Sequence, residues 1–246
     1  MIHVSEALDA MENLPLVTLD ELGMSGLVVV APHPDDESLG CGGLIASARA
    51  AGIAVRIVVV SDGTGSHPNS QEYPHDRLRA LRESEALAAV SELGVSADAV
   101  QFLRLPDRLV PSVGPEAEAA IKAIAAAADA CKASHMAVTW QHDPHRDHRA
   151  TFALTAAARD HRSDVRLLAY PIWGFTLPPD DMLDDTRPRG FRFDMEDHLP
   201  AKRHAIAAHR SQISRLISDD PHGFMLSPAD LARFNRPYEI YLDVNP

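Results

Sequence analysis

The stretch LVVVAPHPDDESLGCGG, residues 27–43, joins a continuous apolar run to a dense group of charged side chains. The run LVVVA is typical of a parallel strand that is covered on both faces. His33, Asp35, Asp36 and Glu37 follow it directly, and three glycines come shortly after them. Charge of this density beside a core costs stability unless something neutralises it. We therefore expect a buried strand whose end faces a neutralising partner.

Three further apolar runs, at 55–62, 99–103 and 136–140, have the same continuous character. Helical patterns alternate with the four runs, near 37–51, 75–93, 115–133 and 148–161. Alternating strands and helices build a parallel sheet with right-handed crossovers. The expected fold class is therefore α/β, a Rossmann-like three-layer sandwich with a mostly parallel sheet. Patterns towards the C-terminus predict two more strands and a helix, at 165–173, 238–244 and 198–217.

The length of 246 residues and the hydrophobic fraction of 46% suit one large domain, expected to span 1–246. Residues 174–200 have little periodicity and are rich in Pro and Asp. Loops this long inside compact domains are usually functional or mobile. We interpret 174–200 as a lid or substrate loop that shapes access to the site.

The charge balance and the cysteines exclude several classes of protein. Lys and Arg number 23 against 35 Asp and Glu, which argues against a nucleic-acid partner. Cys41 and Cys131 form no CxxC pattern and fit a reduced intracellular protein. The N-terminal residues lack the features of a signal peptide, and no apolar run is long enough to span a membrane. We expect a cytoplasmic protein with a small-molecule partner, and a homo-oligomer is compatible with the sequence.

A polar cluster follows each of the four apolar runs. In chain order these are HPDDE, SDGTGSHP, LPD and QHDPHRDH. Ligands of open parallel sheets bind outside the carboxyl ends of the strands, so the four clusters are expected to converge. In the last cluster, Asp143 and Pro144 resemble a helix N-cap and first helical residue. His145 and His148, three residues apart, would then share one face of the opening turn.

The first and last clusters together offer a ligand set for a divalent metal such as Zn²⁺. They contribute two carboxylates and three imidazoles, from Asp35, Asp36, His33, His145 and His148. A metal would neutralise the carboxylates. Three protein ligands would leave one coordination position open, as in catalytic sites, and a carboxylate that does not bind the metal could accept a proton from water.

Simpler interpretations exist for each cluster alone. HPDDE could be an acidic helix start that complements the helix dipole, and QHDPHRDH could be a solvated loop. The glycines of GCGG could suggest a dinucleotide site. Acid fills the turn between the strand and the helix, however, and it would repel a pyrophosphate, so we reject the dinucleotide interpretation.

APHPDDESLGCGG together with the later HDPHRDHRAT resembles the PIG-L/LmbE-like family of metal-dependent N-deacetylases. Further similar stretches are SDGTGS, LRESEALAAVSELGV, FLRLPD and KRHAIAAHRSQI, so the resemblance covers nearly the whole chain. Arg146 stands where the family usually has a proline between the two histidines of the last cluster, and the ligand spacing is unchanged. The resemblance implies an LmbE-like fold.

The resemblance also implies roles for individual residues. Zn²⁺, or alternatively Fe²⁺ or Co²⁺, would be held by three ligands, His33, Asp36 and His148. Asp35 would act as general base, and His145 would stabilise the oxyanion or protonate the leaving amine. Asp147 would orient a neighbouring histidine.

Three further residues are candidates for substrate contact, and each has a structural alternative. Arg82 resembles a substrate-contacting arginine of the family, but it could form an ordinary ion pair with Glu85 on an exposed helix face. Asp107 could bind sugar hydroxyls or serve as a turn residue. His209 and its neighbour Gln212 could contact substrate or have a purely structural role.

These observations predict a metal-dependent hydrolase that removes the acetyl group from an N-acetylglucosamine-type sugar or a sugar conjugate. The same site could instead cleave the amide of a thiol-sugar conjugate. A non-catalytic metal-binding or sugar-binding protein with a Rossmann-like fold is the alternative outside the enzymes.

Overall fold

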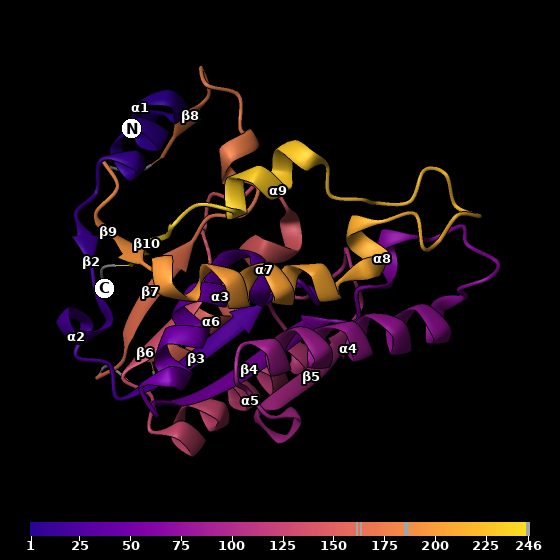
Figure 1. Ribbon diagram of the computed structural model, residues 1–246, viewed down its shortest axis with the longest axis horizontal. Coiled ribbons are helices and arrows are strands. Elements are labelled where there is room, and N and C mark those ends of the chain that lie inside the picture. The colour runs from indigo at the N-terminus through magenta and orange to yellow at the C-terminus, as the bar shows by residue number, and fades with distance from the viewer. Residues whose placement is uncertain (161, 163, 185–186, 245–246) are drawn as a thin grey trace.

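An eight-stranded sheet forms the centre of the protein (Figure 1). The computed structural model describes residues 1–160, 162, 164–184 and 187–244. Five neighbouring strands run parallel, in the spatial order β7 (Arg166–Tyr170), β6 (His135–Thr139), β3 (Gly26–Ala31), β4 (Ala54–Ser61) and β5 (Val100–Leu105). The four apolar runs and the later run at 165–173 are these five strands, so the predicted mostly parallel sheet is confirmed.

The other edge of the sheet is mixed. β10 (Tyr238–Asp243) runs antiparallel to β7 and to β9 (Gly190–Asp194), and β2 (Leu16–Val17) adds parallel to β9. β9 lies within 174–200, so the interpretation of that whole segment as an irregular loop is wrong. A second, short pairing joins β1 (Ile2–His3) to β8 (Met182–Leu183). Residues 185–186 of the segment lie outside the described residues.

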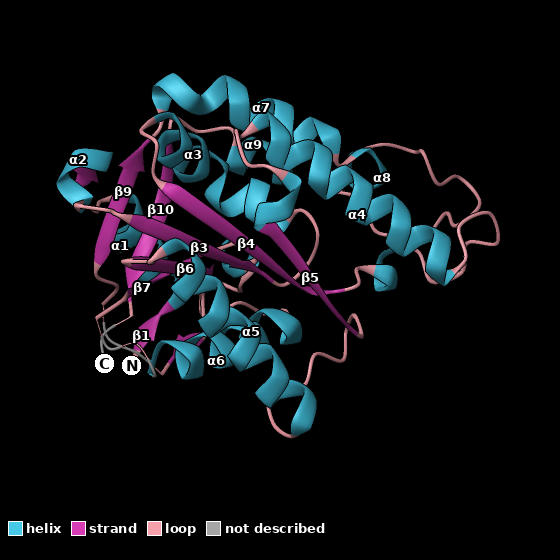
Figure 2. Ribbon diagram, turned by 90° about the horizontal axis from the view of Figure 1, so that it is seen from below, coloured by secondary structure: helices cyan, strands magenta, loops and turns pink. Residues whose placement is uncertain are grey.

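Helices cover both faces of the sheet (Figure 2). One face carries α3 (Asp36–Ala50), α4 (His75–Glu92) and α7 (Leu199–Ala208), and the other carries α5 (Pro115–Cys131) and α6 (Arg146–Asp160). This is the three-layer α/β sandwich that the sequence predicts. The remaining helices are α1 (Val4–Glu12), α2 (Leu19–Leu22), α8 (Arg210–Ile213) and α9 (Pro228–Phe234). Among the described residues, no helix has both the length and the apolar character needed to cross a bilayer.

The helix predicted over 198–217 is interrupted. α7 ends at Ala208, and His209 has a ψ of 57°, which is not helical, before the single turn of α8 begins. A coil then runs from Ser214 to Ser227. The prediction of one continuous helix there is therefore wrong.

β3 is buried along its whole length between two cores. Val29 packs in the core under α3, whereas Val28 and Val30 pack in the core on the α5 and α6 side, because successive side chains of a strand point to opposite faces. The helix that follows β3, α3, packs very close to the end of β7. A Cβ atom on Gly40 would lie 2.2 Å from the ring of Tyr170, so only glycine fits there.

Candidate metal and catalytic site

The site lies at the carboxyl ends of the parallel strands, in a cavity of about 380 Å³. Residues from all four polar clusters line it, as the sequence predicts: His33, Asp35 and Asp36 after β3, Gly65 and Ser66 after β4, Asp107 and Arg108 after β5, and Pro144 and His145 after β6. The clusters converge because parallel strands end at one edge of the sheet. Trp173 and Phe224 complete much of the lining from other segments.

Three donor atoms form a compact triangle at the base of this cavity. His33 Nδ1 lies 3.2 Å from Asp36 Oδ2, and His148 Nε2 lies 3.2 Å from His33 Nδ1 and 3.3 Å from Asp36 Oδ2. Tetrahedral ligands at zinc distances of about 2.0–2.1 Å are separated by roughly 3.3 Å. The predicted ligand triad therefore has the dimensions of a divalent metal site. The ring of His145 is also near, with a nitrogen within 4.8 Å of those of His33 and His148.

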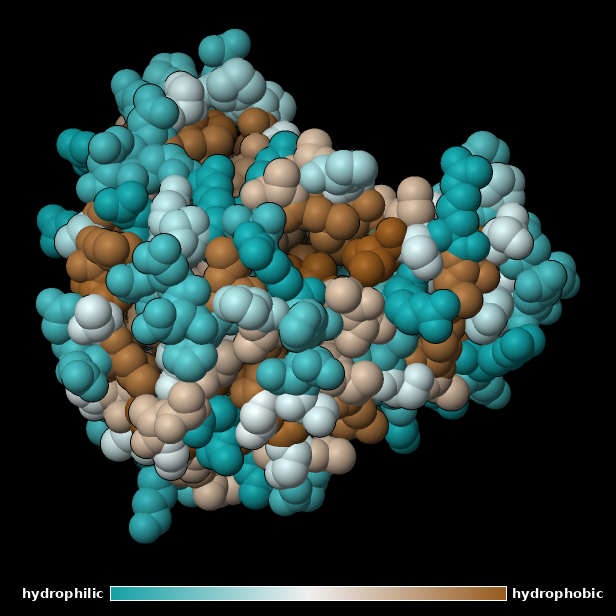
Figure 3. Space-filling view, viewed as in Figure 1, coloured by the Kyte–Doolittle hydropathy of each residue, from teal (hydrophilic) through white to brown (hydrophobic). Residues whose placement is uncertain are grey.

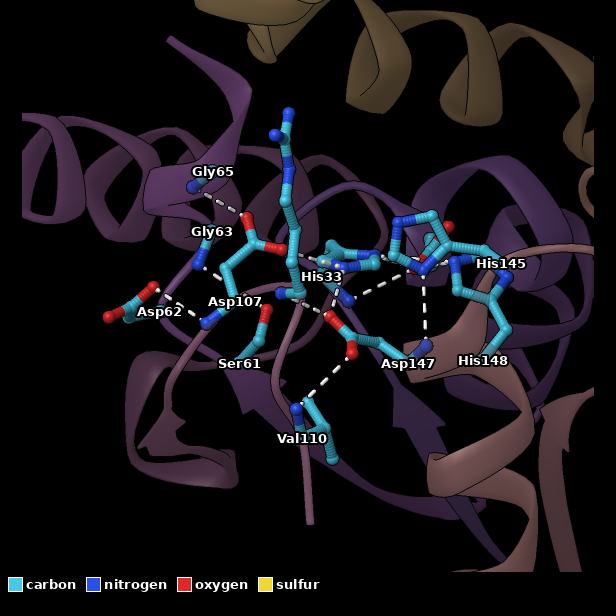
Figure 4. Close-up of polar contacts among 12 residues, drawn as sticks. His33, Ser61, Asp62, Gly63, Gly65, Asp107, Val110, His145, Asp147 and His148 are labelled. Atoms are coloured by element: carbon cyan, nitrogen blue, oxygen red, sulfur yellow. Dashed lines mark hydrogen bonds and ion pairs between the residues drawn. The ribbon is translucent and has the colours of Figure 1, made fainter. Parts of the chain in front are cut away.

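The outer nitrogens of both histidines in the triangle face carboxylates. His33 Nε2 lies 3.2 Å from Asp107 Oδ1 and 3.3 Å from Asp147 Oδ2 (Figure 4). His148 Nδ1 lies 3.3 Å from Asp143 Oδ1. A carboxylate at the outer nitrogen fixes the proton there and leaves the inner nitrogen free to bind a cation. The donor set therefore fits a metal in tautomer as well as in spacing.

The carboxylates of the site favour positive charge on its two ligand histidines. Burial opposes protonation of His33, but the carboxylates of Asp107, Asp147 and Asp36 raise its pKa well above the usual value. Burial also opposes protonation of His148, but Asp36 and Asp143 raise its pKa to about 9. A bound cation would interact favourably with the same carboxylates.

Asp147 and Asp143 are themselves held rigidly. Asp147 accepts hydrogen bonds from the backbone N–H groups of Arg108 (2.6 Å) and Val110 (3.2 Å). Asp143 accepts from the N–H groups of His145 (3.0 Å) and Trp173 (2.7 Å). Asp147 thus lies beside the imidazole of His33. The sequence pattern predicts Asp143 only as a helix N-cap and does not predict its contact with His148.

Asp35 stands beside the triangle but outside it. Its backbone has a φ of 154°, which is rare for a residue with a side chain, and its N–H donates to Glu37 Oε2 at 3.0 Å. Arg82 donates from Nη2 to Asp35 Oδ2 at 3.1 Å. Burial raises the pKa of Asp35 to about 6, and the charge of Arg82 opposes this. Asp35 is thus a buried carboxylate held in a fixed, strained position at the cavity.

Arg82 is only 3% exposed, so its interpretation as an exposed ion pair with Glu85 is wrong. Besides Asp35, it donates to the carbonyls of Gly63 (2.7 Å) and Pro34 (2.8 Å). Glu85 instead accepts hydrogen bonds from the N–H and hydroxyl groups of Ser211. Arg82 therefore lines the cavity and supports the turn that carries Asp35.

His145 lines the cavity and accepts a hydrogen bond at Nδ1 from the N–H of Asp147 at 3.2 Å. Burial, helped by the nearby imidazoles, lowers the pKa of His145 to about 4. A neutral ring that accepts at Nδ1 carries its proton on Nε2. His145 can therefore donate a hydrogen bond from Nε2.

The other candidates for substrate contact differ in whether they line the cavity. Asp107 lines the cavity, where its Oδ2 accepts from the N–H of Gly65 at 2.8 Å. Gln212 also lines it. His209 lies outside the lining, is 1% exposed and contacts Glu37 Oε1 through Nε2 at 3.2 Å. These contacts fit the structural alternative for His209.

Comparison with known proteins relates this geometry to a family. The profile of the GlcNAc-PI de-N-acetylase family (PIG-L) matches residues 28–159, which include the donor triangle and Asp35. A 1D-myo-inositol 2-acetamido-2-deoxy-alpha-D-glucopyranoside deacetylase of Mycobacterium avium is 40% identical over 75 residues, 28% of this chain and 25% of that protein. The match thus spans a quarter of the length of that relative.

Two solved structures share the fold. An N,N'-diacetylchitobiose deacetylase from Pyrococcus horikoshii has a TM-score of 0.65 at 20% identity, with 90% of this chain and 84% of that chain covered. The 4-carboxy-2-hydroxymuconate hydratase of Pseudomonas putida has a TM-score of 0.60 at 19% identity, covering 91% of this chain and 97% of that chain. The fold therefore accommodates more than one reaction. Since the family profile matches more than half of the sequence, the chain belongs to the GlcNAc-PI de-N-acetylase (PIG-L) family.

Proposed function

We propose that this protein is a metal-dependent hydrolase that removes the acetyl group from an N-acetylated amino sugar of the N-acetylglucosamine type, free or as a sugar conjugate. The observation that carries the proposal is the donor triangle of His33, Asp36 and His148 with a separate buried carboxylate, Asp35, beside it. Hydrolysis of an amide needs both an electrophilic centre and a proton acceptor. The two neighbouring aspartates can supply one function each.

The triangle would hold one divalent ion. Two imidazoles and a carboxylate suit Zn²⁺, and Fe²⁺ or Co²⁺ accept the same donors. When bound, such an ion polarises the acetamide carbonyl and lowers the pKa of water. Asp143 and Asp147 would keep the two histidines in the tautomer and orientation that this requires.

Asp35 would accept the proton of the attacking water. One of its carboxylate oxygens, Oδ2, is engaged by Arg82, which leaves Oδ1 for the water. His145 would donate from Nε2 to the oxygen of the acetamide as negative charge develops there. Water adds to the carbonyl carbon, the C–N bond breaks, and the nitrogen takes up a proton, which gives acetate and a free amine.

Two relatives support the choice of substrate. The mycobacterial enzyme acts on a 2-acetamido-2-deoxy-glucopyranoside and the archaeal enzyme on N,N'-diacetylchitobiose, so both act on acetamido sugars. A purely metal-binding role would leave Asp35 unexplained, because a second buried carboxylate in a strained backbone costs stability and adds nothing to a ligand site. We also propose that residues 1–246 act as one domain. Of the described residues in 174–200, only those at its start, up to Thr176, border the cavity.

The test is release of acetate from N-acetylated amino sugars by purified, metal-loaded protein. We expect equal amounts of acetate and free amine from at least one N-acetylglucosamine derivative, and loss of this activity in Asp35→Asn. Full metal loading without acetate release from any acetamido sugar would contradict the proposal. The next assay would then be for a hydration reaction, because a hydratase shares this fold.

A further inference from the structure

The cavity contains an apolar surface that the hydrolysis of an acetamide does not need. Trp173 and Phe224, named here the aromatic wall, pack edge to face with their ring centroids 5.8 Å apart, and both line the cavity. Its volume of about 380 Å³ lies in the usual range for small-molecule ligands, roughly 300–1,000 Å³. There is therefore room in it for a ligand that is large enough to touch both the charged groups and the aromatic wall.

Phe224 is held in place although it lies in a coil. The coil between α8 and α9, yellow in Figure 1, runs beside the loop that follows β4. The N–H of Phe224 donates to the carbonyl of Ser66 at 2.7 Å, and the N–H of Leu226 donates to the carbonyl of Gln212 at 2.8 Å. The backbone at Phe224 and at Leu226 is thus hydrogen-bonded to residues that line the cavity.

Carboxylates strengthen this attachment further along the coil. Asp219 accepts from Ser70 Oγ at 2.7 Å and from the N–H groups of Gln71 and Glu72, at 2.7 and 2.9 Å. Asp220 accepts from the N–H of Asn69 at 2.9 Å. The coil is therefore a fixed part of the site, and its aromatic side chain is preorganised.

The aromatic wall is nevertheless only partly covered by protein. Phe224 is 37% exposed and its neighbour Met225 is 44% exposed, while Leu226 is buried. Figure 3 shows hydrophobic side chains inside the hollow on this face of the molecule. A rigid, half-exposed aromatic ring gains stability when an apolar group covers it, because apolar area leaves water.

We propose that the aromatic wall binds an apolar aglycone, an aryl or alkyl group carried by the amino sugar, so that the chain prefers apolar glycosides of N-acetylglucosamine. This inference rests on the proposed function, because the occupant is the remainder of the substrate whose acetamide lies at the donor triangle. The cavity is continuous between the triangle and the wall. Contacts with an aglycone remote from the reacting bond are equal in the ground state and the transition state, so they act on KM and not on kcat.

The kinetic test compares the phenyl and methyl glycosides of N-acetylglucosamine. We expect the phenyl glycoside to have a KM on the order of tenfold lower at similar kcat. Removing an aromatic ring from water strengthens binding by about that factor. Phe224→Ser should remove this preference, and Phe224→Leu should restore most of it. The matched control is Leu16→Ser, which removes an exposed hydrophobic side chain (52% exposed) on β2 and should leave the preference unchanged.

A binding measurement separates this inference from the proposed function. The chain has two tryptophans; Trp140 is buried, and Trp173 lies in the cavity. Titration of the phenyl glycoside should therefore change the fluorescence of the wild type, with about tenfold weaker binding in Phe224→Ser. If this holds while neither glycoside is deacetylated, the aromatic wall is supported and the proposed function fails. If both glycosides are deacetylated equally well and Phe224→Ser changes neither KM nor binding, the aromatic wall is wrong and the proposed function stands.

Discussion

Glu37 Oε2 accepts a hydrogen bond from the backbone N–H of Asp35 at 3.0 Å. The other carboxylate oxygen of Glu37 accepts from Ser38 Oγ at 2.8 Å and lies 3.2 Å from His209 Nε2. Glu37 is fully buried, so it is not itself available to a substrate. Its position indicates that it stabilises the strained backbone of Asp35 and thereby the direction of the Asp35 carboxylate.

Replacement of Glu37 by Gln should therefore lower kcat more than it changes metal content. An amide in place of the carboxylate weakens the hydrogen bond to the Asp35 N–H and disturbs the contact with His209, and small misplacement of a catalytic group costs on the order of 10²-fold in rate. Steady-state kinetics and metal analysis of the same preparation would check this.

The matched control for that variant is Glu85→Gln, which alters another buried carboxylate whose partner is Ser211. It should reduce stability and leave kcat within a few-fold of the wild type. Equal losses of kcat in both variants would show that Glu37 acts only through overall stability.

Lys202 and Glu239 form a buried ion pair behind α3, with Lys202 Nζ 2.7 Å from Glu239 Oε1. Glu239 also accepts from the N–H groups of Gly43 (2.7 Å) and Leu44 (2.9 Å). Lys202→Met should lower the free energy of unfolding by about 3–5 kcal/mol, because it leaves a buried carboxylate without its cation. Chemical denaturation measures this directly.

The double variant Lys202→Met, Glu239→Gln should recover a large part of that loss, since a neutral amide costs less to bury than a charge. Additive losses in the double variant would mean that the pair does not interact as the structure implies.

Much of this architecture can be predicted because its signals are local and strong. The continuous apolar runs give β3, β4, β5 and β6, and the position of His33 and His148 after two neighbouring strands predicts that they meet. β9 is missed because its alternation of buried Phe191, Arg192 and buried Phe193 is short and is surrounded by Pro and Asp. Phe224 carries no sequence signal, because it reaches the cavity through hydrogen bonds between two coils and not through a strand end.

His135 should make folding sensitive to mild acid. It is 4% exposed at the start of β6, and burial, with the nearby charge of Arg166, lowers its pKa to about 4. In the unfolded chain its pKa is about 6.5, so between these values the unfolded state binds more protons and stability falls as the pH falls. Above about pH 7 the group is neutral in both states and contributes no pH dependence.

The measurement is the free energy of unfolding of wild type and His135→Asn from pH 7.5 to 4.5, in the presence of a chelator so that metal release does not contribute. Over this interval the free energy of unfolding of the wild type should fall by about 2 kcal/mol more than that of the variant. Parallel curves for the two proteins would show that His135 is not the group that titrates.

In the proposed reaction, Asp36 holds the metal and Asp35 accepts the proton. Asp36 Oδ2 is a corner of the donor triangle, whereas Asp35 Oδ2 faces Arg82. Asp36→Ala should therefore lower metal affinity, with activity partly restored by excess metal. Asp35→Asn keeps the shape of the side chain and should keep its metal while kcat falls on the order of 10²- to 10⁴-fold.

The most direct test is a side-by-side determination of bound metal per chain and kcat for these two variants and the wild type. We expect about one metal per chain in the wild type and in Asp35→Asn, a much lower content in Asp36→Ala, and low kcat in both variants. Loss of metal in Asp35→Asn with retention in Asp36→Ala would reverse the two roles, and wild-type kcat in both variants would place the reaction elsewhere.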